Sequence, residues 1–210
     1  MAEKAGTPEK IDLIKLHRAE YAKPKKPVFV DVGPGTYLAV AGKGAPGDAL
    51  FQDRIAALYA VAYTAKFESK FAGRDFVVCK LEALWGSEED GEQSSLATLD
   101  RAAWPWTMVI RVPDFVTEAE LTAARAKLRE KGKQGDFDAV ELVTLEEGRC
   151  VQMLHTGPYE EEGRTLAAMT EVAHAEGLSL HGRHHEIYLS DPRRVPAERL
   201  ETILRRPVRG

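Results

Sequence analysis

The feature that most constrains the fold is an order of elements that occurs twice along the chain. Apolar residues at strand and helix spacing define each element. The first half predicts strands at 28–32, 36–41, 76–85 and 104–112, with a helix after Asp48; the second predicts strands at 138–145, 149–156, 184–190 and 202–208, with a helix at 164–176. We therefore predict an α+β fold of duplicated β-α-β-β units, related by pseudo-twofold symmetry, with a ligand cleft between the halves.

The domain boundaries follow from the same repeat. Residues 28–210 are expected to form one domain, with halves 28–116 and 133–210 joined by a helix at 117–131. Thr117 and Glu120 have the spacing of a capping box at the start of that helix. Residues 1–27 form an N-terminal extension that contains a short helix from Ile11 to Tyr21.

Composition excludes several classes of protein. The formal charge is −4 and no basic stripe is evident, so we expect no nucleic-acid partner. No apolar run approaches the ~18 residues of a membrane span, and the polar N-terminus lacks the apolar region of a signal peptide. Cys79 and Cys150 show no redox or metal spacing, which fits reduced thiols in a cytoplasmic protein. Monomer and homodimer both remain open.

A cofactor is not expected, although one motif invites it. Residues 42–47 match the G-x-G-x-x-G pattern of dinucleotide-binding folds, between a strand and a helix. That fold needs serial βαβ units, whereas this chain shows paired strands between single helices. Pro46 also removes a backbone donor that phosphate would need. We interpret the segment as a strand-to-helix turn.

A metal site is not expected either. His181, His184 and His185 stand close to Glu186, but in a strand only His184 and Glu186 share a face. His185 points to the other side, so a zinc ion would need a further ligand from elsewhere in the chain.

Glu186 is the first candidate functional residue, because it lies in a segment that otherwise reads as a buried strand. A buried carboxylate is costly unless a partner charge, a raised pKa or a ligand compensates it. Tyr188 shares its face, while Ile187 and Leu189 point to the other. In the first half, Glu82 occupies the corresponding place, so we expect the two glutamates to face one another.

Aromatic residues supply candidate walls for a pocket around these acids. Trp104, Trp106 and Met108 are expected on one strand face, and further candidates are Tyr63, Trp85 and Tyr159. Aromatic walls around a buried acid suit a flat, cationic or polarisable ligand through stacking and cation–π attraction.

These residues together resemble the GyrI-like family, in its stand-alone branch, from about Ile11 onward. The resemblance rests on GRHHEIYLSDP at 182–192, TILRRPV at 202–208, LEALW at 81–85 and WPW at 104–106. Related domains serve as small-molecule sensors in multidrug-responsive regulators. The resemblance implies the same duplicated fold, with Glu186 meeting the positive charge of aromatic ligands.

The resemblance leaves three functions open. The first is a stand-alone binder of hydrophobic, aromatic, often cationic small molecules. The second is a hydrolase of cyclopropanoid genotoxins that uses Glu186, with Glu82 and Tyr188 as weaker candidates, to guide water onto a strained ring. The third is a protein-binding inhibitor, like the family member that acts on a gyrase. Only 27 residues precede the first expected strand, which disfavours a DNA-binding module at this end.

Overall fold

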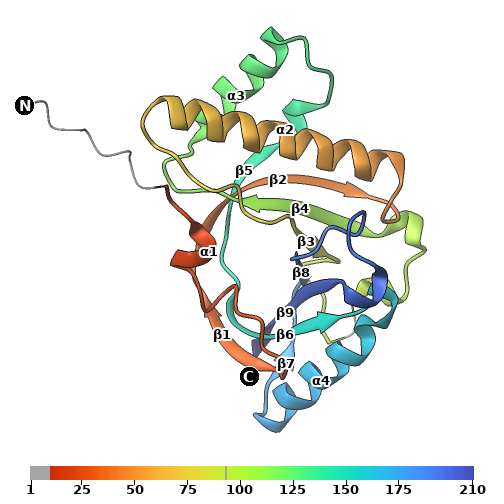
Figure 1. Cartoon of the computed structure of the whole chain (residues 1–210). Helices are drawn as coiled ribbons and strands as arrows, with labels where there is room; N and C mark the ends of the chain where they lie inside the picture. The colour runs from red at the N-terminus through yellow and green to blue at the C-terminus, as the bar shows by residue number, and fades with distance from the viewer. Residues whose placement is uncertain (1–9, 93) are drawn as a thin grey trace, which may run out of the picture.

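The computed structural model, which describes residues 10–92 and 94–210, contains one curled sheet in which every strand pairing is antiparallel (Figure 1). Its strands are β1 (Val28–Val32), β2 (Gly35–Lys43), β3 (Glu82–Trp85), β4 (Pro105–Arg111), β5 (Glu141–Leu145), β6 (Gly148–Thr156), β7 (Ser179–Leu180), β8 (His184–Tyr188) and β9 (Glu201–Arg209). The α-helices are α1 (Leu13–Leu16), α2 (Ala49–Phe71), α3 (Glu118–Glu130) and α4 (Glu162–Ala175). Short 3₁₀ turns are η1 (Ser95–Ala97), η2 (Arg101–Ala103), η3 (Phe137–Ala139), η4 (Tyr159–Glu161) and η5 (Ala197–Arg199).

The strand order confirms the predicted duplication. The sheet runs β1-β6-β9-β8-β3-β4-β2-β5, and β7 pairs with β9 outside this path. The halves meet where β8 pairs with β3, and the order β6-β9-β8 on one side repeats as β2-β4-β3 on the other. The outermost strands are exchanged, since β1 pairs with β6 of the second half and β5 pairs with β2 of the first. The two units are therefore intertwined.

Each half buries one helix against its own strands. The buried positions of α2 include Phe51, Leu58, Ala62 and Ala65, at the three- and four-residue spacing that makes one helix face apolar. That face packs on β2 and β4, while α4 packs on β6 and β9 (Figure 1). None of the helices in the described part of the chain is long and apolar enough to cross a bilayer.

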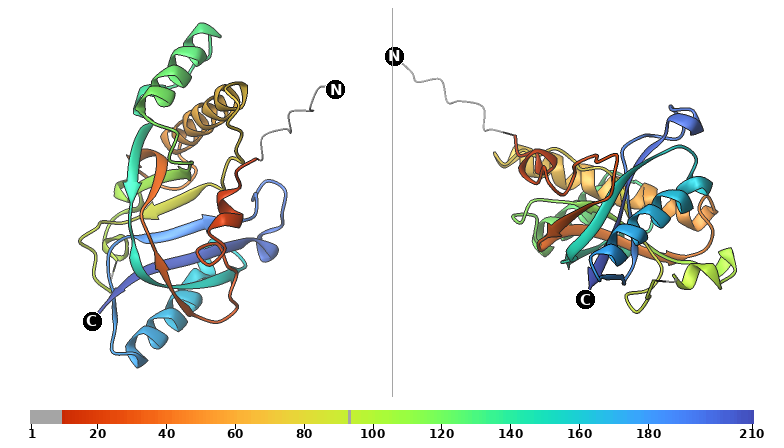
Figure 2. Two further views of the ribbon diagram at one scale, coloured as in Figure 1. Left: turned by 90° about the vertical axis from the view of Figure 1, so that its left-hand side faces the viewer. Right: turned by 90° about the horizontal axis from the view of Figure 1, so that it is seen from below.

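The N-terminal segment covers the opposite side of the sheet. Ile14 and Tyr21 pack against Ile187 of β8 and Ile203 of β9, as the left view of Figure 2 shows for α1 and these strands. The predicted helix from Ile11 to Tyr21 is shorter than expected, because the chain after α1 leaves helical geometry to lie across the sheet.

Two other boundaries differ from expectation. The predicted strand at 76–85 is reduced to β3, since β4 and β8 pair only with residues 82–85. Phe76 instead forms an isolated bridge with Ile11. The helix expected at 164–176 begins two residues earlier, at Glu162, which places a carboxylate on its first turn. The capping box of Thr117 and Glu120 at the start of α3 is confirmed.

Candidate functional site

The strand register assigns each central residue to one face of the sheet. Residues directly opposite one another in paired strands point to the same side. Glu186 lies opposite Ala83 in β3 and Leu204 in β9. Ala83 belongs to the core that contains α2, and Leu204 to the core that contains α4. Glu186 therefore lies between the two helices, on the side that we call the helix face; the other side is the inner face.

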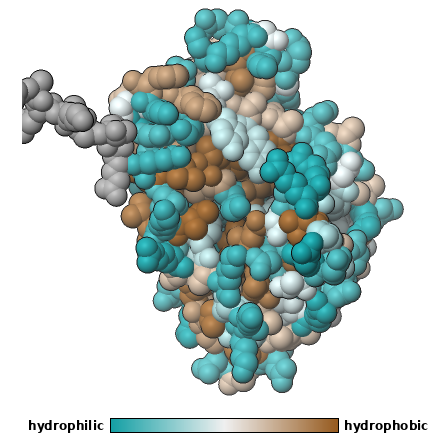
Figure 3. Space-filling model, in the orientation of Figure 1, coloured by the Kyte–Doolittle hydropathy of each residue, from teal (hydrophilic) through white to brown (hydrophobic). Residues whose placement is uncertain are grey.

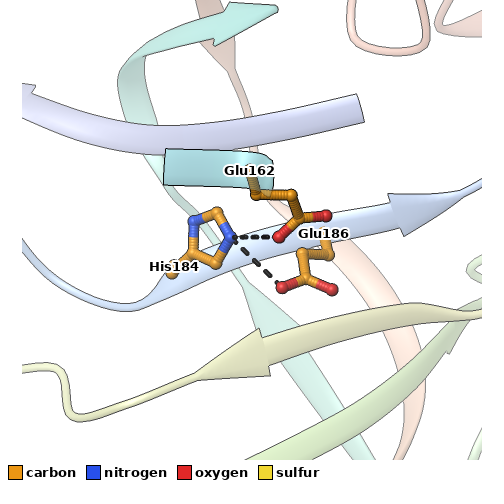
Figure 4. A group of neighbouring side chains, drawn as sticks. All are labelled: Glu162, His184 and Glu186. Atoms are coloured by element: carbon orange, nitrogen blue, oxygen red, sulfur yellow. Dashed lines mark ion pairs between the residues drawn. The ribbon is translucent and has the colours of Figure 1, made fainter. Parts of the chain in front are cut away.

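Two carboxylates and one imidazole form a buried cluster at this position (Figure 4). His184 Nε2 lies 3.2 Å from Glu186 Oε1 and 3.9 Å from Glu162 Oε2. His184 and Glu186 share a face because they are two residues apart in β8, whereas Glu162 enters from the start of α4. Glu162 Oε1 is buried and has no hydrogen-bond partner among the described residues.

The environment sets the three groups to different protonation states. Burial and the charge of Glu186 raise the pKa of Glu162 to about 7. Burial opposes the ionisation of Glu186, but the neighbouring His184, Tyr188 and Trp85 outweigh it and hold the pKa of Glu186 below its usual value. Burial also disfavours the charged form of His184, but the two carboxylates outweigh it and raise the pKa of His184 to about 9. Near neutrality, an imidazolium therefore stands between an ionised Glu186 and a Glu162 that is close to its titration point.

Aromatic rings adjoin this cluster on the helix face. The Trp85 indole Nε1 donates a hydrogen bond to the Tyr188 hydroxyl at 3.4 Å. Trp104 meets Trp85 edge-on, with ring centroids 6.3 Å apart, and Tyr159 meets Tyr188 edge-on at 6.0 Å. Tyr159 is 36% exposed, so it marks the end of the wall that reaches solvent. Brown apolar residues are visible across the middle of the molecular face in Figure 3, beneath α2.

Most of the predicted site residues come together here. Trp106 and Met108 lie on the helix face as expected, but both are fully covered in the core beneath α2. Phe51 of α2 meets the Trp106 ring edge-on at 5.2 Å. Trp106 and Met108 therefore lie behind the exposed aromatic rings and support them.

The predicted pairing of Glu82 with Glu186 is wrong. Glu82 lies opposite Ile187, so it belongs to the inner face. Its carboxylate accepts hydrogen bonds from the Tyr21 hydroxyl at 2.8 Å and contacts His185 Nε2 at 3.0 Å. The sheet separates it from the cluster around Glu186.

Tyr63 also lies elsewhere. It is 48% exposed on α2 and lines a groove of about 490 Å³ between α2, the end of α3 and η3. None of the residues that surround Glu186 lines this groove.

Glu162 was not among the site residues predicted from the sequence, although the sequence carries a signal for it. Glu162, Thr165, Met169 and Ala173 follow one another at three- and four-residue spacing and are the buried residues of α4. Extending the apolar face of that helix by one turn would have placed Glu162 on it.

Glu162 also changes the argument about a metal. Glu162, His184 and Glu186 each offer a ligand atom, and these atoms lie within 4.8 Å of one another. His184 and Glu186 alone were expected on this face of β8, and Glu162 is a further ligand from elsewhere in the chain. Such spacing suits proton exchange among the three side chains and also suits one divalent ion.

Comparison with solved structures finds close relatives over the whole fold. A hydrolase from Listeria innocua is 42% identical, with a TM-score of 0.85, over 95% of this chain and 100% of that chain. A conserved protein from the same organism, described as uncharacterized, is 43% identical with a TM-score of 0.86 over the same shares of the two chains. The C-terminal domain of EcmrR shares the fold at 9% identity, with a TM-score of 0.58 over 88% of this chain and 97% of that domain.

Comparison with protein families gives one assignment, whereas no curated protein matches the chain. The description "GyrI-like small molecule binding domain" matches residues 25–209, which include the sheet, α2 to α4 and all three members of the buried cluster. The chain belongs to the GyrI-like family of small-molecule-binding domains.

Proposed function

We propose that this protein hydrolyses small, flat, hydrophobic molecules that carry a strained three-membered ring, and that Glu186 and Glu162 perform the chemistry. The observation that carries the proposal is the buried cluster in which His184 Nε2 lies 3.2 Å from Glu186 and 3.9 Å from Glu162, and the pKa values of the two carboxylates are displaced in opposite directions there. Environments that separate two acids in this way provide one ionised base and one protonated acid. The hydrolase from Listeria innocua, at 42% identity, supports the same class of reaction.

The proposed reaction adds water across a strained carbon–carbon bond that is conjugated to a carbonyl group. The Glu186 carboxylate accepts a proton as the water oxygen bonds to the ring carbon. The ring bond breaks, and its electron pair moves through the conjugated system to the carbonyl oxygen. Glu162 donates a proton to that oxygen. His184 lies between the two carboxylates, so it can return the proton from Glu186 to Glu162.

The aromatic wall has a separate role in this proposal. Trp104 and Tyr159 offer ring surfaces against which a flat substrate packs, and Trp85 supports Trp104 from the core, where it is stacked on Phe51. Burial raises the pKa of the Tyr159 hydroxyl to about 12 and that of Tyr188 well above its usual value, so both hydroxyls remain hydrogen-bond donors at neutral pH. The Tyr159 hydroxyl, at the exposed end of the wall, can orient the substrate carbonyl before the ring opens.

The test is turnover of a cyclopropanoid substrate, followed by loss of its conjugated absorbance and by mass spectrometry of the hydrated product. Glu186→Gln and Glu162→Gln are expected to lower kcat by about 10²–10⁴-fold. The matched control is Glu171→Gln, because Glu171 is an exposed glutamate on the same helix. Saturable binding without any product from the wild-type protein would reject the hydrolase proposal.

A second candidate function is reversible binding of aromatic cations. It is favoured by an ionised, buried Glu186 beside aromatic rings, since breaking a desolvated charge pair is costly. Fluorescence titration with a flat cationic dye should show weaker binding to Glu186→Gln, while a neutral dye of similar shape should bind both proteins alike. Equal affinity of the cation for the two proteins would count against this function.

A further inference from the structure

The inner face carries a second buried polar cluster, directly behind β8. We call it the inner-face network, and its central members are Glu82, His185, Glu147 and Arg205. His185 Nε2 lies 3.0 Å from Glu82 Oε2, and His185 Nδ1 lies 2.9 Å from Glu147 Oε2. Arg205 Nη1 donates to the same Glu147 oxygen at 2.9 Å. His185 and Glu82 are fully buried, and Arg205 is 1% exposed.

This geometry fixes the protonation of His185. Each ring nitrogen faces a carboxylate oxygen, and an ionised carboxylate can only accept hydrogen bonds. Both nitrogens must therefore carry hydrogen, which makes the ring an imidazolium. The charge of Glu147 is the largest of the influences that raise the pKa of His185 against the effect of its burial.

Charge balance on the inner face leads to the same assignment. Arg111 Nη1 lies 2.5 Å from Glu20 Oε2, which neutralises that pair. Arg183 pairs with Glu88 at the edge of this face, which neutralises that pair as well. Within the network the carboxylates are Glu82 and Glu147, and Arg205 supplies one positive charge against them. A protonated His185 supplies the other. Other titratable or polar groups on this side are Tyr21, Tyr37, Cys79, Cys150 and Gln152.

The network acts on the same short strand that carries the site. β8 has five residues, and His185 stands between His184 and Glu186 with its side chain on the opposite face. Its two ion pairs reach β3 and the turn between β5 and β6, so they restrain the strand from two directions. A small rotation of β8 would move both His184 and Glu186 relative to Glu162, which belongs to α4.

We infer that His185 is a positioning residue for the reaction proposed above: held between Glu82 and Glu147 on the inner face, it fixes the places of Glu186 and His184 on the helix face. His185 itself touches no part of the helix-face cluster. His185 contributes the positive charge that keeps the inner-face network neutral and fully paired. An unpaired charge behind β8 would drive the strand to rearrange.

The inference rests on the proposed hydrolase function, so wild-type turnover is measured first and by itself tests that function. His185→Gln leaves the carboxylates on the inner face in excess and should lower kcat by about 10- to 100-fold with KM changed less than about threefold. The double variant His185→Gln with Glu82→Gln restores neutrality and should recover most of the lost kcat.

Arg111→Gln is the matched control. It removes a buried charge from the same face and leaves Glu20 without this partner, but it lies on β4, and among the described residues it forms no hydrogen bond or ion pair with β8. It should lower the thermal midpoint while leaving kcat within about twofold. If His185→Gln does not fold, Glu82→Gln takes its place, since it removes one of the two partners of His185.

A readout independent of activity completes the experiment. The ¹⁵N ring signals of His184 should shift in His185→Gln, return toward the wild-type positions in the double variant and stay unchanged in Arg111→Gln. Unchanged His184 signals in His185→Gln, or equal losses of kcat in His185→Gln and Arg111→Gln, would overturn the inference. Because the signals can be recorded without substrate, they report whether His185 fixes the place of His184 separately from whether the protein turns over a substrate.

Discussion

At the scale of single residues, two glutamates with the same functional group are assigned different tasks by their surroundings. Glu186 lies 3.2 Å from His184, whose charge favours the ionised carboxylate, whereas Glu162 has one buried oxygen without a partner and a neighbouring negative charge. The difference comes from geometry within a few ångströms. The proposed division into base and acid depends on this asymmetry.

This asymmetry predicts the pH dependence of turnover. Glu162 must be protonated to donate, and its pKa is raised to about 7, so activity should fall as the pH rises through this value. Glu186 must be ionised, and its lowered pKa places the acidic loss of activity well below that. A kcat–pH profile of the wild type and of Glu162→Gln measures this. The alkaline loss should be missing from the residual activity of the variant, and its persistence there would assign it to another group.

Metal removal gives a second prediction for the same residues. If the cluster works by proton exchange, dialysis against EDTA should leave kcat within about twofold, because the reaction then needs only the carboxylates and His184. Turnover before and after dialysis, with Zn²⁺ added back as a control, measures this. Loss of activity that Zn²⁺ restores would instead show that the three ligand atoms hold a catalytic ion.

At the scale of elements, the wall of the site depends on how closely β2 approaches β4. Gly42 lies opposite Trp106, and a Cβ atom at residue 42 would overlap the Trp106 indole. The indole in turn meets Phe51 of α2. Gly42, the first glycine of the G-x-G-x-x-G motif, lies within β2 and has a packing role there, since glycine alone leaves room for the ring.

Gly42→Ala is therefore expected to destabilise the protein by about 1–3 kcal/mol, because the indole must move into a filled core. Urea denaturation followed by tryptophan fluorescence measures the change and reports the indole environment at the same time. Gly33→Ala is the control, since a Cβ atom at Gly33 meets nothing within 4 Å. Equal stability of the two variants would contradict the packing role.

At the scale of the whole molecule, the fold includes residues that the family match does not cover. The match begins at residue 25, yet Tyr21 donates a hydrogen bond to Glu82 at the centre of the sheet. Gln152 of β6 donates to the carbonyl groups of Ala19 and Ala22, and Glu20 pairs with Arg111 of β4. The segment before β1 thus closes the inner face over the polar network.

Tyr21→Phe tests this connection. Loss of the hydroxyl leaves one buried oxygen of Glu82 without its donor, which should cost about 1–3 kcal/mol of unfolding free energy. Chemical denaturation of the variant measures the loss. Tyr63→Phe, at a half-exposed position on α2, should change stability by less than about 0.5 kcal/mol. A Tyr21→Phe variant as stable as Tyr63→Phe would show that the segment does not support the sheet.

Sequence alone predicted the elements whose evidence is local. The duplicated order of strands and helices, the capping box of α3 and the shared face of His184, Glu186 and Tyr188 follow from periodicity of a few residues. The sheet also brings together Trp85 and Trp104, which stand at the ends of predicted strands, and their role as walls of a ligand site stays a prediction.

Only the tertiary structure decided which acids meet. The sequence comparison of the two halves matched Glu82 with Glu186, but the β3–β8 register puts them on opposite faces, so that alignment is out of step by an odd number of residues. Side chains alternate along a strand, and a slip of one residue sends every one of them to the other side. The partner of Glu186 is Glu162 of α4 and not the expected Glu82. Only long-range packing brings α4 to β8, so no local pattern could show this pairing. Local periodicity fixed the face that Glu186 occupies, and the partner that faces it was decided by contacts between distant parts of the chain.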